Sequence, residues 1–369
     1  MATQEELIAA IQLRMVPGVG DIIARSLIQY AGSAQAVWEY SKERLMAVPG
    51  VGLSVAQEIR ANRELKKRAE QELKKCKEEG IAIYYYKDEA YPQRLKSFPD
   101  SPLLLFGKGT IDCNPVRMLA VVGTRKCSEF GKEFTRQLVE RLKDMDCTLV
   151  SGLALGIDTA AHRAAVEFGL PTLGVLGHGF NTLYPYQNRA LAEEMQKKGG
   201  LLTEFLFASP PDAENFPKRN RIVAGICDAL VVVETALKGG ARITAEIANA
   251  YNKDVMAVPG RPGDLQSLGC NYLIRENKAI LINTPEDLLK DLNWLPGSKV
   301  KPFQQQLNFT LSEEDGRIVQ FIRERRQVGI DEIAFGLGMD QSYLAFRLLE
   351  LEFSGFIRAL PGKLFEVKR

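Results

Sequence analysis

The chain has 369 residues, of which 48 are Lys or Arg and 46 are Asp or Glu, so its net charge is only +2. A chain of this length predicts about two or three domains with a sizeable core. The balanced charge excludes attraction of the whole molecule to nucleic acid, so any anion binding has to come from local patches.

Two further classes of protein are not expected from the sequence. The six cysteines lie far apart, with no CxxC pair and no Cys/His cluster, so neither a zinc site nor a disulfide framework is predicted. No apolar run approaches the roughly 18 residues that indicate a membrane span. We therefore expect a cytoplasmic protein with reduced thiols and no membrane partner.

Residues 1–75 contain an internal repeat. The stretches "VPGVGDIIARSLI" from Val16 and "VPGVGLSVAQEI" from Val48 share VPGVG, and helical periodicity flanks each. This pattern predicts a tandem helix-hairpin-helix (SAM-like) domain. Its glycines would let backbone N–H groups approach a phosphate; alternatively, they serve only the packing of a helical domain. The charged helix 65–79 that follows is interpreted as a solvated connector.

Residues 80–292 predict an α/β domain. Short apolar runs alternate with helical stretches at Phe130–Met145, Asp158–Phe168 and Ile243–Tyr251. The predicted strands are "MLAVVG", "CTLVSG", "PTLGVLG", "LLTEF", "ALVVVE" and "DVMAVPG". Such alternation predicts an extended Rossmann-like, doubly wound and mostly parallel sheet covered by helices on both faces.

The last part of the chain predicts a linker and a small domain. Residues 293–311 lack periodicity and are interpreted as the linker. Residues 312–369 predict a winged-helix-like domain, with helices at Glu313–Arg325, Asp331–Leu337 and Gln341–Phe353 before a strand-like end. Its recognition helix sets Arg347 against two glutamates, which favours protein contact or dimer support over DNA binding.

A candidate site lies at the strand ends, because ligands of open parallel sheets bind at the carboxyl ends of the strands. The stretch "FPKRNRIVAG" is expected to form a basic loop between the strands that end at Glu204 and Glu234. The candidate residues at this rim are Arg125, Lys126, Gly152, Gly177, Gly179, Phe216, Lys218, Arg219, Arg221, Gly240 and Arg261. Cations, open glycines and interspersed aromatic rings together predict binding of single-stranded nucleic acid.

Two alternatives remain open for these residues. Arg219 or Arg221 could instead form a structural ion pair with Glu204, Glu214 or Glu234, and the tyrosines could cap the core. No catalytic residues, metal ligands or cofactor site are predicted, because no nucleophile, base and orienting group occur at a recognisable spacing and no P-loop is present. His162 is expected to bond locally to Asp158.

Seven blocks of the sequence resemble one family. These are "VVGTRKCSEFG", "SGLALGIDTAAH", "GHGFNTLYPYQN", "FPKRNRIVAG", "VVVETALKGGARITAEIA", "AVPG" and "GCNYLI", which occur in the order found in the DNA-processing protein A (DprA, or Smf) family. The resemblance runs through most of residues 80 to 290. It implies a cytosolic bacterial protein that binds single-stranded DNA, forms a homodimer, protects incoming DNA and loads the RecA recombinase during natural transformation.

The resemblance also adds to the site. It places the family's DNA-contacting Arg on Arg125 and its basic block on Lys218, Arg219, Asn220 and Arg221, and it extends the site to Arg242 and Asn271. This chain departs from many relatives at Gly239-Gly240, where the inserted Arg242 keeps the loop positive, and at Gln187, where relatives can have a basic residue.

A nucleotide-processing phosphoribohydrolase that shares the Rossmann core is the alternative function. Gly239, Gly240, Thr244 and Glu246 loosely resemble its GG…T…E segment. In that family the acid follows the threonine by three residues, and here it follows by two. On a helix this difference rotates the carboxylate by about 100°, away from the expected site. A DNA-binding protein without catalysis is therefore the favoured interpretation.

Overall fold

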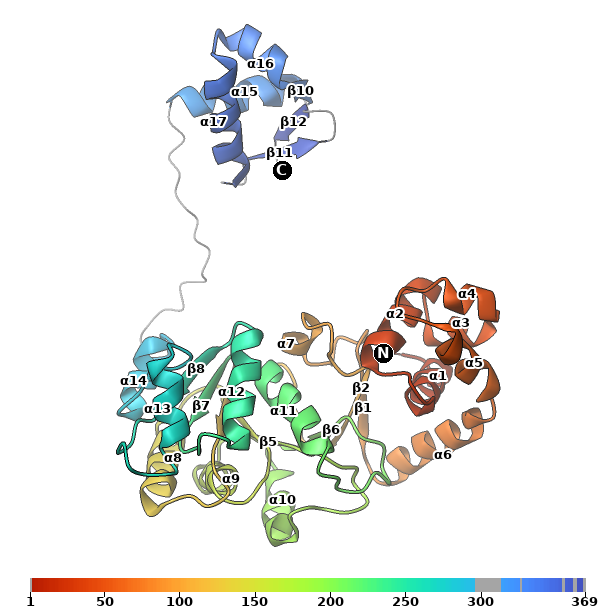
Figure 1. The fold of residues 1–369 in the computed structure, drawn as a ribbon, viewed down its shortest axis with the longest axis vertical. Helices are drawn as coiled ribbons and strands as arrows, with labels where there is room; N and C mark the ends of the chain where they lie inside the picture. The colour runs from red at the N-terminus through yellow and green to blue at the C-terminus, as the bar shows by residue number, and fades with distance from the viewer. Residues whose placement is uncertain (1, 296–312, 326, 354–355, 361–363, 368–369) are drawn as a thin grey trace. The chain divides into compact units, whose positions relative to one another are not determined.

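The computed structural model describes residues 2–295, 313–325, 327–353, 356–360 and 364–367, which divide into two units, Met1–Leu292 and Asn293–Arg369 (Figure 1). The predicted linker 293–311 lies outside the described residues except for its first three. All six cysteines are free thiols. None of the helices in the described ranges is both long and apolar enough to cross a membrane.

Six helices between residues 4 and 78 form the helical domain of the first unit (Figure 1). They are α1 (Gln4–Met15), α2 (Asp21–Ala31), α3 (Ala34–Glu39), α4 (Lys42–Met46), α5 (Leu53–Ala61) and α6 (Leu65–Glu78). The two VPGVG motifs form hairpins between α1 and α2 and between α4 and α5. Their turns need positive φ, 78° at Gly18 and 84° at Gly50, which glycine adopts at little cost. The predicted helix-hairpin-helix tandem is confirmed.

Helix α6 differs from its prediction as a solvated connector. Leu65, Ala69, Leu73 and Cys76 are buried, and their spacing places them on one face of the helix. This face joins the same apolar cluster as Ile8 and Ile11 of α1. The charged residues cover only the outer face, so α6 is part of the helical core.

A nine-stranded sheet forms the centre of the first unit. Its strands are β1 (Ala82–Tyr85), β2 (Leu104–Gly109), β3 (Arg117–Val122), β4 (Cys147–Ser151), β5 (Thr172–Val175), β6 (Gly200–Thr203), β7 (Ala229–Val232), β8 (Asp254–Ala257) and β9 (Ile280–Leu281). Their order is β1-β2-β6-β5-β4-β3-β7-β8-β9. Strands β3 to β9 are parallel, and β1 and β2 extend the sheet antiparallel. All six predicted strands are present.

The topology marks one place in this sheet. From β3 the chain builds outward through β4, β5 and β6, and then returns to add β7, β8 and β9 on the other side of β3. Strand β3 pairs in register with both neighbours, Leu119 with Leu149 of β4 and with Ala229 of β7. The carboxyl ends of β3, β4 and β7 therefore form the switch point where such sheets bind ligands.

Helices cover both faces of the sheet, as predicted. They are α7 (Gln93–Lys96), α8 (Glu129–Leu142), α9 (Ile157–Phe168), α10 (Arg189–Met195), α11 (Asn215–Ile226), α12 (Gly240–Ala250), α13 (Leu268–Arg275) and α14 (Pro285–Asp291), with a 3-10 turn at Tyr186–Asn188. Residues of α11, α12 and α13 share one apolar cluster with Met118, Ala120 and Val122 of β3. Helices α8, α9 and α10 lie on the other side of the sheet (Figure 1).

The second unit has the predicted winged-helix plan. It contains α15 (Glu313–Arg325), β10 (Val328–Gly329), α16 (Ile330–Leu337), α17 (Gln341–Phe353), β11 (Ile357–Leu360) and β12 (Leu364–Val367), with sheet order β10-β12-β11. Ile318, Ile333 and Leu348 belong to its buried core. On α17, Arg347 pairs with Asp315 and Glu350, while Phe346 is 57% exposed. Protein contact through this helix stays a prediction.

Candidate nucleic-acid interface

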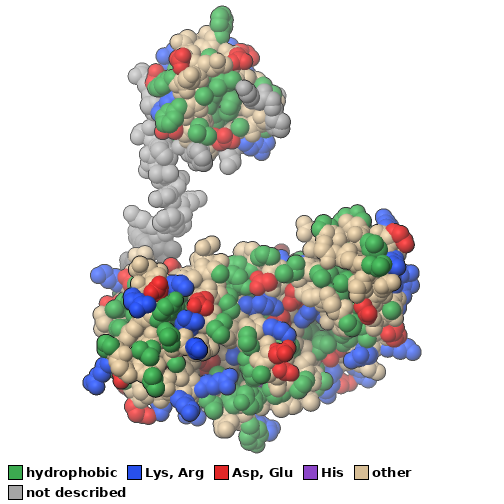
Figure 2. Space-filling model, in the orientation of Figure 1, with side chains coloured by type: hydrophobic (Ala, Val, Ile, Leu, Met, Phe, Trp, Pro, Cys, Tyr) green, Lys and Arg blue, Asp and Glu red, His purple; other side chains and the backbone are tan. Residues whose placement is uncertain are grey.

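A groove of about 910 Å³ opens at the switch point of the sheet. Four segments line it: residues 122–126 after β3, residues 152–158 after β4, residues 211–223 with the start of α11, and residues 235–244 with the start of α12, together with Tyr184 and Gln266. We call this hollow the strand-end groove. On the face shown in Figure 2, basic and acidic side chains are interspersed.

Two cations stand at the mouth of the strand-end groove. Arg125 and Lys126 line it and are exposed, and neither forms an ion pair with any residue that the structure describes. The Arg125 guanidinium lies 5.7 Å from the centroid of the Phe216 ring, and the Phe216 and Tyr184 ring centroids are 5.8 Å apart. The groove thus combines unpaired positive charge with a pair of aromatic rings.

The loop that carries these cations is fixed on both sides. The N–H of Thr124 donates to the Glu234 carbonyl at the end of β7 (2.7 Å), and the Thr124 carbonyl accepts from the N–H of Ile157 at the start of α9 (3.2 Å). Gly156 has φ 86°, and a Cβ there would collide with the Thr124 carbonyl. The close approach of the two loops therefore requires glycine at this position.

The basic stretch from Phe216 to Gly225 is a helix, and its prediction as a loop is wrong. It lies within α11, where Pro217 occupies the third position. A proline is tolerated there because the N–H groups of the first turn have no partner inside the helix. The sequence prediction missed this helix, which is anchored by buried Ile222 and Val223.

Arg219 lies in the wall of the groove, but its head is buried. The side chain is 5% exposed and donates to the carbonyls of Gly152 and Val175, at the ends of β4 and β5. Burial lowers the pKa of Arg219 to about 10, against the opposing effect of the Asp158 carboxylate. The residue therefore stays charged at neutral pH and ties two strand ends together.

Asp158 organises the loop beside Arg219. Its carboxylate accepts hydrogen bonds from the N–H groups of Gly152 (3.1 Å) and Ala154 (3.3 Å). Burial raises the pKa of Asp158, and the charge of Arg219 opposes this shift. The carboxylate thus has a structural role in positioning the Gly152 backbone at the groove.

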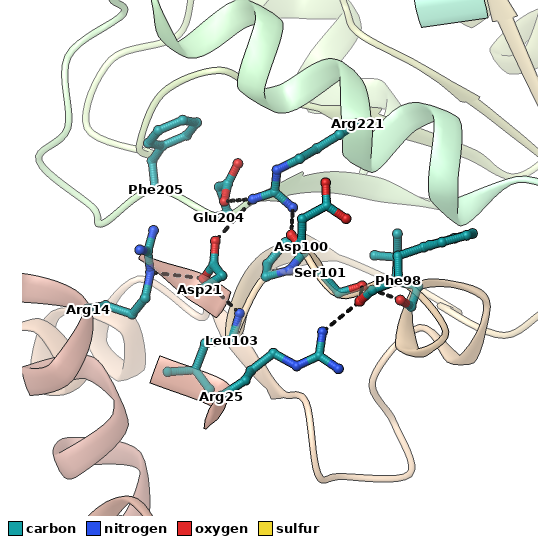
Figure 3. Close-up of polar contacts among 12 residues, drawn as sticks. Arg14, Asp21, Arg25, Phe98, Asp100, Ser101, Leu103, Glu204, Phe205 and Arg221 are labelled. Atoms are coloured by element: carbon teal, nitrogen blue, oxygen red, sulfur yellow. Dashed lines mark hydrogen bonds and ion pairs between the residues drawn. The ribbon is translucent and has the colours of Figure 1, made fainter. Parts of the chain in front are cut away.

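Arg221 does not line the strand-end groove. Figure 3 shows that its side chain points toward Glu204, Asp21 and Asp100. Its guanidinium pairs with Glu204 and with Asp21 of α2 (3.1 Å), and it also donates to the Asp100 carbonyl. The structural ion pair that the sequence left open is thus the arrangement found for Arg221. Its placement at the basic rim is wrong, because residues 219 and 221 face opposite sides of a helix.

Several other predicted residues lie outside the groove lining. Gly177 packs under the Phe216 ring, and Gly179 packs against the backbone of Leu206 and Phe207. Lys218 is exposed on α11 without lining the groove.

The loops after β7 and β8 hold the remaining predicted residues. Arg242 pairs with Glu246 (3.7 Å) and lies over the Tyr272 ring (5.3 Å), and the exposed Arg261 is not a lining residue. Asn271 holds the backbone of Gly260 through two hydrogen bonds of 3.1 and 2.8 Å. The groove therefore gathers seven of the predicted residues, namely Arg125, Lys126, Gly152, Phe216, Arg219, Asn220 and Gly240.

The titratable side chains near the strand ends have structural partners. His162 Nδ1 lies 2.7 Å from Thr172 Oγ1, so the expected bond to Asp158 is wrong. Glu234 accepts from the N–H and hydroxyl of Ser128, the N-cap residue of α8. Glu246 pairs with Arg242 outside the groove lining. Within the described ranges, no cluster of three or more potential metal ligands occurs.

The sequence prediction missed part of the groove. Thr235, Ile243 and Gln266 line it, and no local pattern in the sequence marks them. The start of α12, at the predicted Gly240, borders the groove as well: the Gly239 N-cap has no side-chain hydrogen bond, and a Cβ at Gly240 would meet open space. The first N–H groups of α12 therefore present a positive helix end to an anion.

Comparisons with known proteins agree along the whole chain. Family profiles match residues 10–67 (SAM-like helix-hairpin-helix tandem), 82–293 (DNA recombination-mediator protein A) and 304–363 (DprA winged helix domain). Protein Smf of Escherichia coli K12 is 36% identical over 290 residues, which cover 76% of each chain.

Two solved structures are similar as well. The X-ray structure of DNA processing protein A from Streptococcus pneumoniae matches with a TM-score of 0.68 and 30% identity, covering 79% of this chain and 99% of that one. A structure of DNA processing protein A from Helicobacter pylori, described as showing its single-stranded DNA binding mode, matches with a TM-score of 0.53 and 25% identity, covering 58% of this chain and 96% of that one.

Proposed function

The chain belongs to the DNA recombination-mediator protein A family, and we propose that it binds single-stranded DNA in the strand-end groove. In this proposal Arg125, Lys126 and the N-terminus of α12 hold the phosphates, while Phe216 and Tyr184 receive unstacked bases. The exposed Lys218 contacts the strand outside the groove. The relative from Helicobacter pylori, whose structure is described by its single-stranded DNA binding mode, supports the choice of ligand.

One observation carries the proposal. Two unpaired cations, two neighbouring rings and an open helix N-terminus converge in one hollow at the switch point of the sheet. Charge that follows a backbone and rings that stack on bases are the two requirements for binding an unpaired strand without reading its sequence. A duplex keeps its bases stacked inside, so we expect it to bind more weakly.

The wider role follows the family. We propose that the bound strand is protected and passed to a RecA recombinase in the cytoplasm during recombination or natural transformation, and that the protein acts as a homodimer. We also propose that it does so without catalysis. The placement of its acids supports this, because Asp158, Glu234 and Glu246 each have a backbone, capping or ion-pair partner.

Fluorescence anisotropy with a labelled oligothymidine tests the proposal. We expect sub-micromolar affinity and a log–log salt slope of roughly −0.7 for each phosphate contact. Arg125→Met should weaken binding equally for all base sequences and reduce the magnitude of the slope by about 0.7. Arg136→Met is the matched control, because Arg136 is paired with Glu167 and neither residue lines the groove.

The outcomes separate the two functions. A salt-independent affinity, or an unchanged affinity in a folded Arg125→Met variant, would remove the groove from DNA binding. Release of free base from nucleoside monophosphates, abolished by Glu246→Gln, would instead establish the phosphoribohydrolase function.

A further inference from the structure

The segment Phe98–Leu103, which directly precedes β2, contacts α2 of the helical domain (Figure 3). Arg25 of α2 donates to the carbonyls of Phe98 (2.7 Å) and Pro99 (3.3 Å). Asp21, in the first turn of α2, accepts from the N–H of Leu103 (2.9 Å). We call Phe98–Leu103 the junction segment, because α2 binds its backbone at both ends.

The two helices that form one wall of the groove contact the same segment. Arg221 of α11 donates to the Asp100 carbonyl. Tyr251, which directly follows α12, donates to the Asp100 carboxylate (2.6 Å) and stacks on the Phe98 ring with centroids 3.9 Å apart. At their other faces or ends, α11 and α12 present Asn220 and Gly240 to the groove. The junction segment therefore touches the helical domain and both groove helices.

A buried charge cluster adds a direct link. Arg221 bridges Glu204, at the end of β6, and Asp21 of the helical domain, and Asp21 also pairs with Arg14 (3.3 Å). With Glu204 ionised, the four side chains balance two positive against two negative charges, and the Glu204 side chain is 4% exposed. Loss of one member of such a cluster leaves a buried charge without its partner. The position of α11 is thus coupled to that of α2.

We infer that the helical domain clamps α11 and α12 against the sheet and so sets the affinity of the strand-end groove for single-stranded DNA, with Arg221 as the positioning residue. The inference rests on the proposed function of the groove. Arg219, which ties Gly152 to the groove wall, lies two residues from Arg221 on the same helix. If α11 and α12 are already held in their binding geometry, they lose less conformational entropy when DNA binds. Loss of the contacts with the helical domain should therefore weaken DNA binding.

Variants on the helical side of the clamp provide the test. Arg25→Met and Asp21→Asn change no groove residue and leave the Arg221–Glu204 pair in place. We expect each to raise the dissociation constant for oligothymidine about 5-fold or more, the usual lower range of coupling between sites. The salt slope should stay unchanged, because no phosphate contact is lost. Arg136→Met again serves as the control, and thermal unfolding by circular dichroism verifies that each variant is folded.

A second measurement uses the reciprocity of coupling. Oligothymidine should slow hydrogen exchange of the α2 amides, residues 21–31, in the natural chain, and this protection should be lost in Asp21→Asn. Unchanged affinity in both folded variants, or unchanged α2 exchange on binding, overturns the clamp while leaving DNA binding intact. Failure of the natural chain to bind oligothymidine at all overturns the proposed function and the clamp with it.

Discussion

We predict that Glu204 makes the stability of the first unit depend on pH. Burial raises the pKa of Glu204 to about 7 from the ordinary 4.5; the Arg221 charge opposes this shift, and the Asp21 charge adds to it. The groups that face Glu204 are Arg221 of α11, Asp21 of α2 and Arg14 of α1. Between pH 4.5 and about 7 the folded protein therefore binds a proton that the unfolded chain releases. The resulting stabilisation is complete below pH 4.5 and is lost as the pH rises through about 7.

The size of the effect follows from the two pKa values. A difference from 4.5 to about 7, at about 1.36 kcal/mol for each unit, corresponds to about 3 kcal/mol of unfolding free energy. Glu204→Gln keeps the shape of the side chain and removes its titration. Relative to this variant, the natural chain should lose roughly 2–3 kcal/mol of stability between about pH 5 and about pH 8.

Urea unfolding across this pH range measures the difference. The fluorescence of Trp38 reports on the helical domain, because Trp38 packs against the domain core and its indole N–H donates to the Ala9 carbonyl (3.2 Å). The natural chain and the Glu204→Gln variant both carry Trp294→Phe, so that Trp38 is the one tryptophan that contributes to the signal. Glu129→Gln is the control, because Glu129 is exposed and paired with Lys132. The difference in unfolding free energy between this variant and the natural chain should not change with pH. Parallel pH profiles for the natural chain and Glu204→Gln would show that Glu204 is ionised throughout and would refute the argument.

Two further predictions concern residues beside the groove. Gly156→Ala places a Cβ against the Thr124 carbonyl and should lower the free energy of unfolding by more than about 3 kcal/mol. Gly80→Ala, at φ 64° in open space, should lower it by only about 1 kcal/mol. Equal urea midpoints for the two variants would contradict the steric argument. Burial, with the Arg219 charge as a second cause, lowers the pKa of His162 to about 3. The NMR signals of its imidazole should therefore not move between about pH 5 and about pH 8, and a titration near pH 6.5 would contradict the burial of this side chain.

The strands were predictable because each is a short apolar run between turn residues. Leu119, Val121 and Leu149 are fully buried. These short runs lack the 3.6-residue periodicity of an amphipathic helix, so the sequence pattern indicates buried parallel strands. The buried face of α6 was not predicted, because Leu65, Ala69, Leu73 and Cys76 are separated by charged residues that dominate its composition. Composition describes the average side chain, whereas packing depends on the face of the helix to which each side chain belongs.

The candidate site was predicted only in part, for one geometrical reason. In a loop, Arg219 and Arg221 could turn toward the same rim, but successive residues on a helix are rotated by about 100°, so these two point about 200° apart. One faces the strand-end groove, and the other reaches Asp21, 200 positions earlier in the chain. No local pattern could reveal that partner, because the contact exists only after the helical domain docks. The same separation allows one basic helix to contact both the groove and the junction segment. A substitution on either face of α11 is therefore expected to shift the residues on the opposite face.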